Sequence, residues 1–220
     1  MVEIQISGPG KNALGTELIA QLTDQIKAAN GAPLLFVGDG DAFSAGLNLK
    51  EVASLDAEGM NDFLDRLEAF FRLIWLYPGP TVAAINGHAI AGGCIMAMCC
   101  DRVIATSNPK ARIGLNEVAI GLRFPPALLN FVRATINPQH LSEVVLGAGL
   151  HSPVDAVRLG LAHAVSDDPV ADARVALAAL AKHPATAYSA AKLDLRDGIM
   201  EATESEQRTF KDDVVPFWTS

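Results

Sequence analysis

Three segments of this 220-residue chain carry groups that together could remove a proton from carbon. Two of them, Ala42 to Lys50 (AFSAGLNLK) and Ile85 to Asp101 (INGHAIAGGCIMAMCCD), have the pattern of strand ends that pass through glycine into a helix. Backbone N–H groups at a helix start have no acceptor inside the helix, so they can bind a developing negative charge. The third segment, Ile113 to Gly121 (IGLNEVAIG), supplies the carboxylate of Glu117. Two amide donors and one base are the groups needed to take a proton from carbon next to a carbonyl.

Glu117 stands among apolar neighbours. A glutamate on a loop near a strand is usually a solvated surface group, but here Ile113, Leu115, Val118 and Ile120 flank it. Removal from water disfavours the charged form and raises the pKa of a carboxyl group. We therefore predict a partly desolvated Glu117 with a raised pKa, suited to accepting and returning a proton.

The composition indicates a globular protein that does not bind polyanions. Half of the residues are hydrophobic, 19% are charged, and the net charge is −8. No run of lysines or arginines is present, so the electrostatic signature of a nucleic-acid-binding protein is missing. The segment Thr81 to Cys100 lies within the longest stretch without a charged residue, and Asn86, Gly87 and two further glycines divide it. We predict no membrane span, no nucleic-acid partner and a cytoplasmic location.

The three cysteines, Cys94, Cys99 and Cys100, form no pairing or metal-binding pattern. Their number is odd, and no CxxC spacing is present, which argues against a disulfide framework and a zinc site. We interpret them as small buried side chains in a reducing compartment. A nucleophilic Cys94 is the alternative, because it follows the glycines of a helix start that could lower the pKa of its thiol.

The hydrophobic pattern alternates between strands and helices. Strands are expected at Val2–Ile6 and Pro33–Val37, with leucines at helical spacing from Leu14 onward between them. The same order returns in a helix over Asp56–Leu76, which a Tyr-Pro-Gly-Pro sequence stops. This alternation predicts an α/β fold with mostly parallel strands. Further expected elements are strands at Thr81–Ile85, Arg102–Ala105 and Ala162–Val165, and helices at Gly92–Cys100, Ala127–Thr135, His140–Leu146, Pro153–Leu159, Val170–Lys182 and from Ala185 onward.

The motifs FSAGLNLKE, NGHAIAGGC and NEVAIGL follow one another along the chain. In this order they resemble the crotonase (enoyl-CoA hydratase/isomerase) superfamily, across roughly residues 2 to 205. The resemblance implies a crotonase-like spiral of ββα units with an acyl-CoA site in residues 1–160, and a helical C-terminal trimerisation region in residues 161–220. It also implies an acyl-CoA thioester as substrate, no separate cofactor or metal, and a homotrimer or hexamer.

The resemblance also implies roles for individual residues. By position in the motifs, the backbone N–H groups of Leu47 and Gly92 hold the thioester oxygen, and Glu117 is the acid–base group. An enolate oxygen forms when a proton leaves C2, and the loss of one donor in a comparable site costs about 2.7 to 4 kcal/mol. Two lysines are expected near CoA, although an isolated surface lysine is usually only solvated. The CoA-binding residues that the resemblance implies are Lys11, Ser44, Ala45 and Lys50.

The expected reaction depends on the number of carboxylates. The resemblance implies that a hydratase of this superfamily has two catalytic carboxylates, one just after the GGC motif and one in the later segment. This chain has Ile95 at the first position and Glu117 at the second, and a hydrocarbon side chain cannot activate water. A single carboxylate can take a proton from C2 of a 3-enoyl thioester and return it at C4, so we predict a Δ3,Δ2-enoyl-CoA isomerase. The alternatives are hydration or another crotonase reaction, such as decarboxylation or hydrolysis, and acyl-CoA binding without turnover.

Overall fold

A five-stranded parallel sheet forms the larger part of the core. The structure, a computed structural model, describes residues 1–219, and Ser220 of the predicted C-terminal region lies outside the described residues. The strand order is β1-β2-β4-β6-β8, and all neighbours in this sheet pair in parallel. The predicted α/β fold with parallel strands is confirmed. The five strands are β1 (Val2–Ile6), β2 (Leu34–Gly38), β4 (Thr81–Ile85), β6 (Arg102–Thr106) and β8 (Ala164–Ser166).

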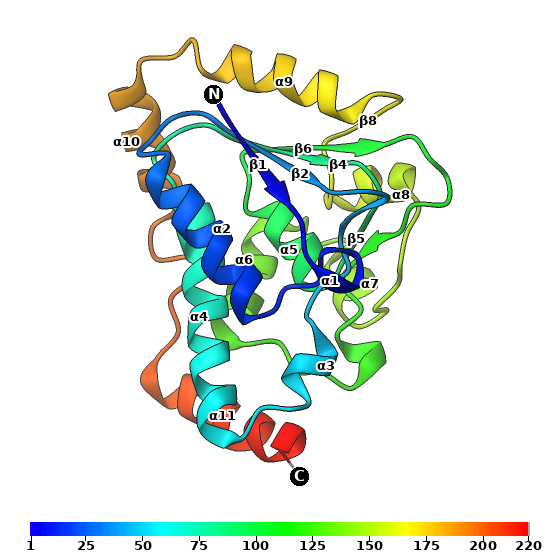
Figure 1. Cartoon of the computed structure of the whole chain (residues 1–220), viewed down its shortest axis with the longest axis vertical. Coiled ribbons are helices and arrows are strands. Elements are labelled where there is room, and N and C mark those ends of the chain that lie inside the picture. Colours follow the sequence, from blue (N-terminus) through cyan, green and yellow to red (C-terminus); the bar gives the residue numbers. More distant parts are fainter. Residues whose placement is uncertain (220) are drawn as a thin grey trace.

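Helices cover both faces of this sheet. Successive side chains of a strand point to opposite faces, and in β2 Leu34 and Phe36 join the main core, whereas Leu35 and Val37 pack against the second cluster. Helix α9 (Pro169–Leu180) covers that second face, and α2 (Thr16–Ala28), α4 (Ala57–Trp75) and α5 (Gly92–Met98) lie on the other (Figure 1). Burial on both faces explains why the strands are continuous apolar runs in the sequence.

Helix α4 begins and ends near its predicted bounds, and an aspartate caps its start. The Asp56 carboxylate accepts a hydrogen bond from the Gly59 N–H at 2.8 Å and caps the first turn. Apolar residues at helical spacing, among them Met60, Phe63 and Leu67, are buried. One side of α4 thereby faces the core and contacts α11 (Glu204–Thr219).

A second, smaller sheet consists of β3 (Ala42–Ser44), β5 (His88–Ile90) and β7 (Ile113–Gly114), in the order β3-β5-β7. All its pairings are parallel, with Ser44 opposite Ala89 and Ile90 opposite Gly114. Strand ends were expected in the segments of β3 and β5, but no bounds could be given for the three strands, because two or three residues are too few to show a period. Parallel pairing brings their carboxyl ends to one edge of the sheet.

Most of the predicted helices lie close to their expected positions, but the one helix expected from Ala185 onward is two, α10 (Ala185–Arg196) and α11, because the chain leaves the helix at Asp197 and Gly198, where Gly198 has a φ of +76°. Leu14 was expected to begin the helix that follows β1, but it lies before α2 and forms a parallel bridge with Leu47. The division of the chain at residue 160 stays a prediction, and β8 pairs with β6 across it.

Among the described residues, no helix has both the length and the apolar character needed to cross a bilayer. The other elements are α1 (Pro9–Asn12), α3 (Leu49–Val52), η1 (Val118–Ile120), α6 (Pro126–Thr135), α7 (Leu141–Val145) and α8 (Pro153–Leu159).

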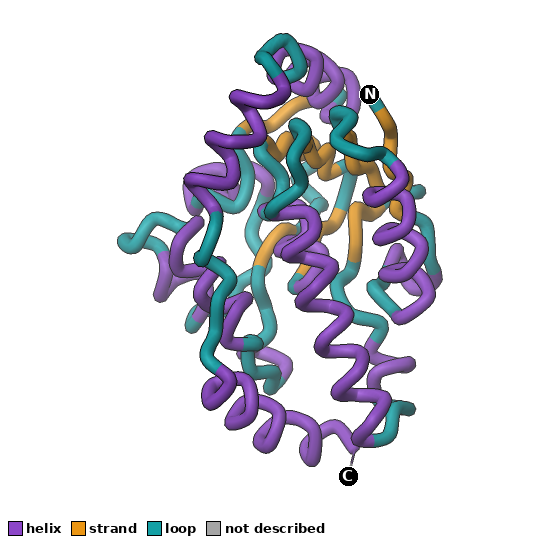
Figure 2. Tube along the Cα trace, turned by 90° about the vertical axis from the view of Figure 1, so that its left-hand side faces the viewer, coloured by secondary structure: helices purple, strands orange, loops and turns teal. Residues whose placement is uncertain are grey.

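Helix α11 lies at the end of the molecule opposite α9, as Figures 1 and 2 both show. Its residues Phe210 and Val215 are buried. Two ion pairs hold the helix to the rest of the chain, one from Lys211 to Asp65 of α4 at 2.6 Å and one from Arg123 to Asp213. The helix is therefore fixed beside α4 and the loop that follows η1.

Candidate active site

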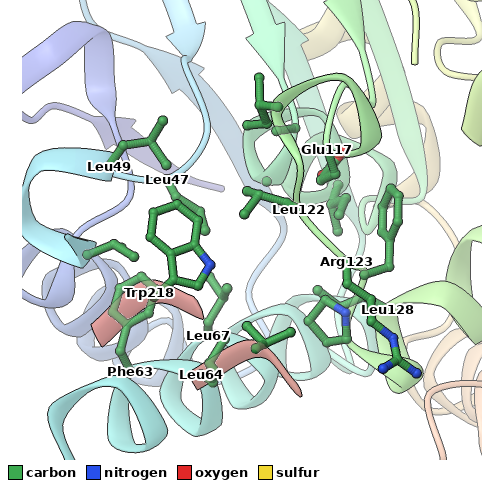
Figure 3. A pocket seen from close by; sticks show the side chains of 18 of the residues that line it. Leu47, Leu49, Phe63, Leu64, Leu67, Glu117, Leu122, Arg123, Leu128 and Trp218 are labelled. Atoms are coloured by element: carbon green, nitrogen blue, oxygen red, sulfur yellow. The ribbon is translucent and has the colours of Figure 1, made fainter. Parts of the chain in front are cut away.

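The three motifs meet because each one follows a strand of the small sheet. Strand β3 leads to Leu47, β5 leads to Gly92, and β7 leads to Glu117. The carboxyl ends of parallel strands form the edge at which ligands of open α/β sheets usually bind. A cavity of about 190 Å³ lies at this edge, and all three residues line it. In Figure 3 the Glu117 side chain lies across the cavity from Leu47 and Trp218.

Glu117 is a buried carboxylate with an unpaired oxygen. Only 8% of the residue is exposed, and its Oε2 has no hydrogen-bond partner within residues 1–219. Burial raises the pKa of Glu117 to about 7, against a smaller lowering by its own backbone amide. The backbone carbonyl of Glu117 accepts hydrogen bonds from the N–H groups of Leu122 at 2.8 Å and Ile120 at 3.2 Å. The turn therefore fixes a carboxyl group that can change its protonation near neutral pH.

Gly46 allows Leu47 to approach Gly92. Its φ is +88°, and a Cβ at this position would lie 2.8 Å from the Ile90 carbonyl oxygen and 3.5 Å from the Gly92 nitrogen. A larger residue would be strained there and would separate the two segments. The structure thus brings the two predicted amide donors to the same wall of the cavity.

The peptide groups on both sides of Leu47 are held by Leu14. The Leu14 N–H donates to the Gly46 carbonyl at 2.7 Å, and the Asn48 N–H donates to the Leu14 carbonyl at 2.9 Å. In a parallel bridge of this kind the N–H of the central residue points away from the partner strand. Within residues 1–219, the backbone N–H groups of Leu47 and Gly92 donate no hydrogen bond, so both are free to bind a ligand.

A buried polar network supports this wall from behind. Asn12 is 3% exposed, and its Nδ2 donates to the carbonyl oxygens of Asp39 and Ala42, both at 2.9 Å. The Ser44 hydroxyl donates to the Asn12 carbonyl at 2.8 Å and accepts from the Gly46 N–H at 3.3 Å. Asn12 has a φ of +60°, a conformation that asparagine adopts more readily than most residues. Asn12 belongs to none of the three motifs, so the sequence alone does not indicate its role.

The four residues predicted to contact CoA lie in different surroundings. Ala45 lines the cavity, and its N–H donates to the Lys11 carbonyl at 3.0 Å. Ser44 is fully buried. The Lys11 ammonium pairs with Asp41 at 3.0 Å on the surface, and Lys50 is exposed. Neither lysine lines the cavity, and a role in CoA binding stays a prediction for all four.

The cavity has apolar walls and a single carboxylate. Among the described lining residues, Glu117 alone is acidic, and the other polar groups belong to Asn116, Arg123 and the indole N–H of Trp218. Ile95, at the position predicted to decide the reaction, lines the cavity and is 2% exposed. The apolar walls come mainly from α4 and α11, through Met60, Phe63, Leu64, Leu67, Phe71, Phe210, Val214 and Trp218.

The alternative nucleophile Cys94 is not supported. Its side chain is fully buried and does not line the cavity. Burial and the neighbouring Glu117 raise the pKa of the Cys94 thiol further above its ordinary value, which disfavours the thiolate that would react. In the part of the chain that the structure describes, no group of three or more His, Cys, Asp or Glu side chains could hold a metal ion.

Known proteins with related sequences carry two activities in their names. The crotonyl-CoA hydratase of Syntrophomonas wolfei is 32% identical over 159 residues, which are 70% of this chain and 60% of the relative. The mitochondrial enoyl-CoA delta isomerase 1 of Mus musculus is 28% identical over 164 residues, 72% of this chain and 56% of the relative. The matches thus span about 60% of the length of these curated relatives. Hydratase names are the more common among the relatives.

The fold and the whole-chain sequence pattern agree on one family. The human mitochondrial Δ3,Δ2-enoyl-CoA isomerase superposes with a TM-score of 0.91 at 24% identity, covering 99% of this chain and 87% of the human one. At this identity the likeness shows the crotonase fold. The sequence profile of the family described as enoyl-CoA hydratase/isomerase matches residues 1–216. This protein therefore belongs to the enoyl-CoA hydratase/isomerase family.

Proposed function

We propose that this protein isomerises 3-enoyl-CoA thioesters to 2-enoyl-CoA thioesters, with Glu117 as the single acid–base group. One observation carries the proposal: Glu117 is the only carboxylate among the described residues that line the cavity. Hydration needs one group to hold water and another to deliver a proton, and Ile95 can do neither. Moving a double bond needs one base that returns the proton it has taken.

In the proposed reaction the thioester oxygen binds between the N–H groups of Leu47 and Gly92. Ionised Glu117 takes a proton from C2, and the electron pair of that C–H bond forms the C1–C2 double bond of a dienolate. Its negative charge resides on the thioester oxygen, where preformed donors stabilise it by several kcal/mol. The C1–O double bond of the thioester then re-forms, and the C1–C2 electron pair moves to make the C2–C3 double bond. The electron pair of the former C3–C4 double bond takes the proton back from Glu117 and forms the new C4–H bond.

The environment of Glu117 suits both proton transfers. A catalytic acid–base group works best when its pKa lies near the operating pH, and burial raises that of Glu117 to about 7. The apolar walls keep bulk water from the dienolate, which would otherwise be protonated at random. A homotrimer or hexamer and a cytoplasmic location, expected from the sequence, are proposed along with this activity.

Hydration of 2-enoyl-CoA is the second candidate, because the name of one relative favours it. The 32% identical relative is named a crotonyl-CoA hydratase. Within the described lining, however, no second group able to exchange a proton faces Glu117. We therefore rank hydration below isomerisation for this chain.

The test uses purified protein and 3-hexenoyl-CoA. Conversion gives a conjugated thioester, which is followed by its ultraviolet absorbance. Glu117→Gln keeps the size of the side chain and cannot accept the proton, so the rate should fall by about 10² to 10⁴. Glu143→Gln is the matched control, because Glu143 is an exposed carboxylate paired with Arg158 at 2.7 Å outside the cavity. Full activity of folded Glu117→Gln would overturn the proposal.

A further inference from the structure

Two side-chain oxygens, on consecutive residues that both line the cavity, lack hydrogen-bond donors. Within residues 1–219, only three buried side-chain nitrogen or oxygen atoms have no partner, and two of them are Asn116 Oδ1 and Glu117 Oε2. Both residues line the cavity, whereas the third, His151, does not. Buried polar groups in folded proteins are nearly always hydrogen-bonded. The pair therefore indicates that a bound molecule supplies the missing donors.

No side-chain donor of the described residues reaches these two oxygens, and the free N–H groups of Leu47 and Gly92 are proposed to bind the thioester oxygen. Apart from Asn116 and Glu117, two side chains of the described lining carry N–H groups, Arg123 and Trp218, and in Figure 3 Trp218 lies across the cavity from Glu117. The Arg123 guanidinium is already paired with Asp213 of α11, and in Figure 3 it lies away from Glu117. A ligand that fills the cavity with hydrocarbon alone would leave both oxygens unpaired.

The side chain of Asn116 does not shape its own loop. Asparagine often stabilises turns by bonding to nearby backbone groups, but within residues 1–219 the Asn116 carboxamide makes no such bond. The turn after β7 is instead closed by backbone hydrogen bonds to the Glu117 carbonyl. A leucine of similar size would fit apolar walls without leaving a polar atom unpaired, so the carboxamide needs another explanation.

We propose that Asn116 is a specificity-determining residue whose carboxamide oxygen accepts a hydrogen bond from an O–H group bound beside Glu117. That O–H group belongs either to a hydroxyl on the acyl part of the thioester or to a water molecule kept in the site when the acyl part is hydrocarbon. The inference rests on the proposed acyl-thioester site. An amide orients a donor but exchanges no proton at neutral pH, so Asn116 does not replace the second carboxylate of a hydratase.

The preference can be measured without turnover. Calorimetry compares the binding of hexanoyl-CoA and 3-hydroxyhexanoyl-CoA, two saturated thioesters that differ by one hydroxyl. If the ligand supplies the O–H group, the hydroxy compound should bind about tenfold more tightly, since an unpaired buried acceptor costs about one factor of ten or more in affinity. Asn116→Leu should abolish this preference. Asn130→Leu is the control, because Asn130 donates to the Glu201 carbonyl at 2.8 Å and does not line the cavity.

If water supplies the O–H group, the wild-type protein should bind both thioesters equally. A crystal structure of the hexanoyl-CoA complex should then show an ordered water within hydrogen-bond distance of Asn116 and Glu117. Equal binding together with the absence of that water would overturn the inference, and neither measurement requires the Asn116 variant to fold. Chromatography of the titrated 3-hydroxyhexanoyl-CoA separates the two proposals: its dehydration would contradict the isomerase assignment, not the role of Asn116.

Discussion

Burial of Glu117 predicts that its replacement by glutamine stabilises the protein in a pH-dependent way. Burial raises the pKa of this carboxyl group from an ordinary 4.5 to about 7. Between these two values the folded protein holds a proton that the unfolded chain has released. The free energy of unfolding of the wild type therefore falls as the pH rises through this window. Glutamine carries no ionisable group, so the free energy of unfolding of Glu117→Gln lacks this decrease with pH.

The magnitude follows from the two pKa values. A difference in pKa between the folded and unfolded states contributes about 1.4 kcal/mol per unit. Between pH 5 and pH 8, the unfolding free energy of Glu117→Gln should rise relative to that of the wild type by about 2.5 kcal/mol. Most of this change should fall between pH 5 and pH 7, and little should follow above the folded-state pKa.

Urea denaturation at fixed protein concentration, repeated across this pH range, measures the difference. Glu206→Gln is the control here: the exposed carboxyl of Glu206 has a pKa lowered below 4.5 by hydrogen bonds from Thr203, and it does not line the cavity. Its stabilising charge is lost only at lower pH, so the difference between this variant and the wild type should stay flat from pH 5 to pH 8. A flat difference for Glu117→Gln as well would refute the inference that Glu117 is desolvated.

The remaining predictions concern catalysis. The kcat/KM for 3-hexenoyl-CoA should fall about tenfold per pH unit below pH 7 and level off above it, because only ionised Glu117 accepts the C2 proton; a rate independent of pH from 5 to 8 would contradict this. Ile95→Glu should introduce measurable hydration of crotonyl-CoA that Ile95→Gln lacks, and equal rates in both variants would count against the role of Ile95. Asn12→Ala should lower the free energy of unfolding by about 1 to 3 kcal/mol. It should also lower kcat more than it raises KM, with no change in the pH profile. A change in KM alone would contradict the inference that Asn12 positions Leu47.

The long elements of the fold could be predicted from the sequence. The helix over α4 shows apolar residues at regular spacing and a capping aspartate, and β4 is a short apolar run bounded by turn residues, so local patterns were sufficient. The small sheet could not be predicted, because β7 has only two residues and β3 and β5 have three each. That sheet nevertheless brings the three motifs together, and only their resemblance to a family indicated that they meet.

Burial of Glu117 was predicted correctly, but only part of the reasoning holds. Of its four apolar neighbours, Ile113 and Leu115 are fully buried, whereas Val118 and Ile120 are 45% and 44% exposed. The preceding strand, and not the following turn, thus carries the burial. Contacts between residues far apart in the sequence were beyond prediction, such as those of Asn12 with β3 and the pairing of Lys11 with Asp41.

The central claim is that a single carboxylate isomerises and does not hydrate. The most direct measurement is the product distribution when purified protein acts on 3-hexenoyl-CoA to completion, resolved by chromatography. We predict that trans-2-hexenoyl-CoA accumulates and that 3-hydroxyhexanoyl-CoA stays a minor product. Formation of 3-hydroxyhexanoyl-CoA as the main product would contradict the claim.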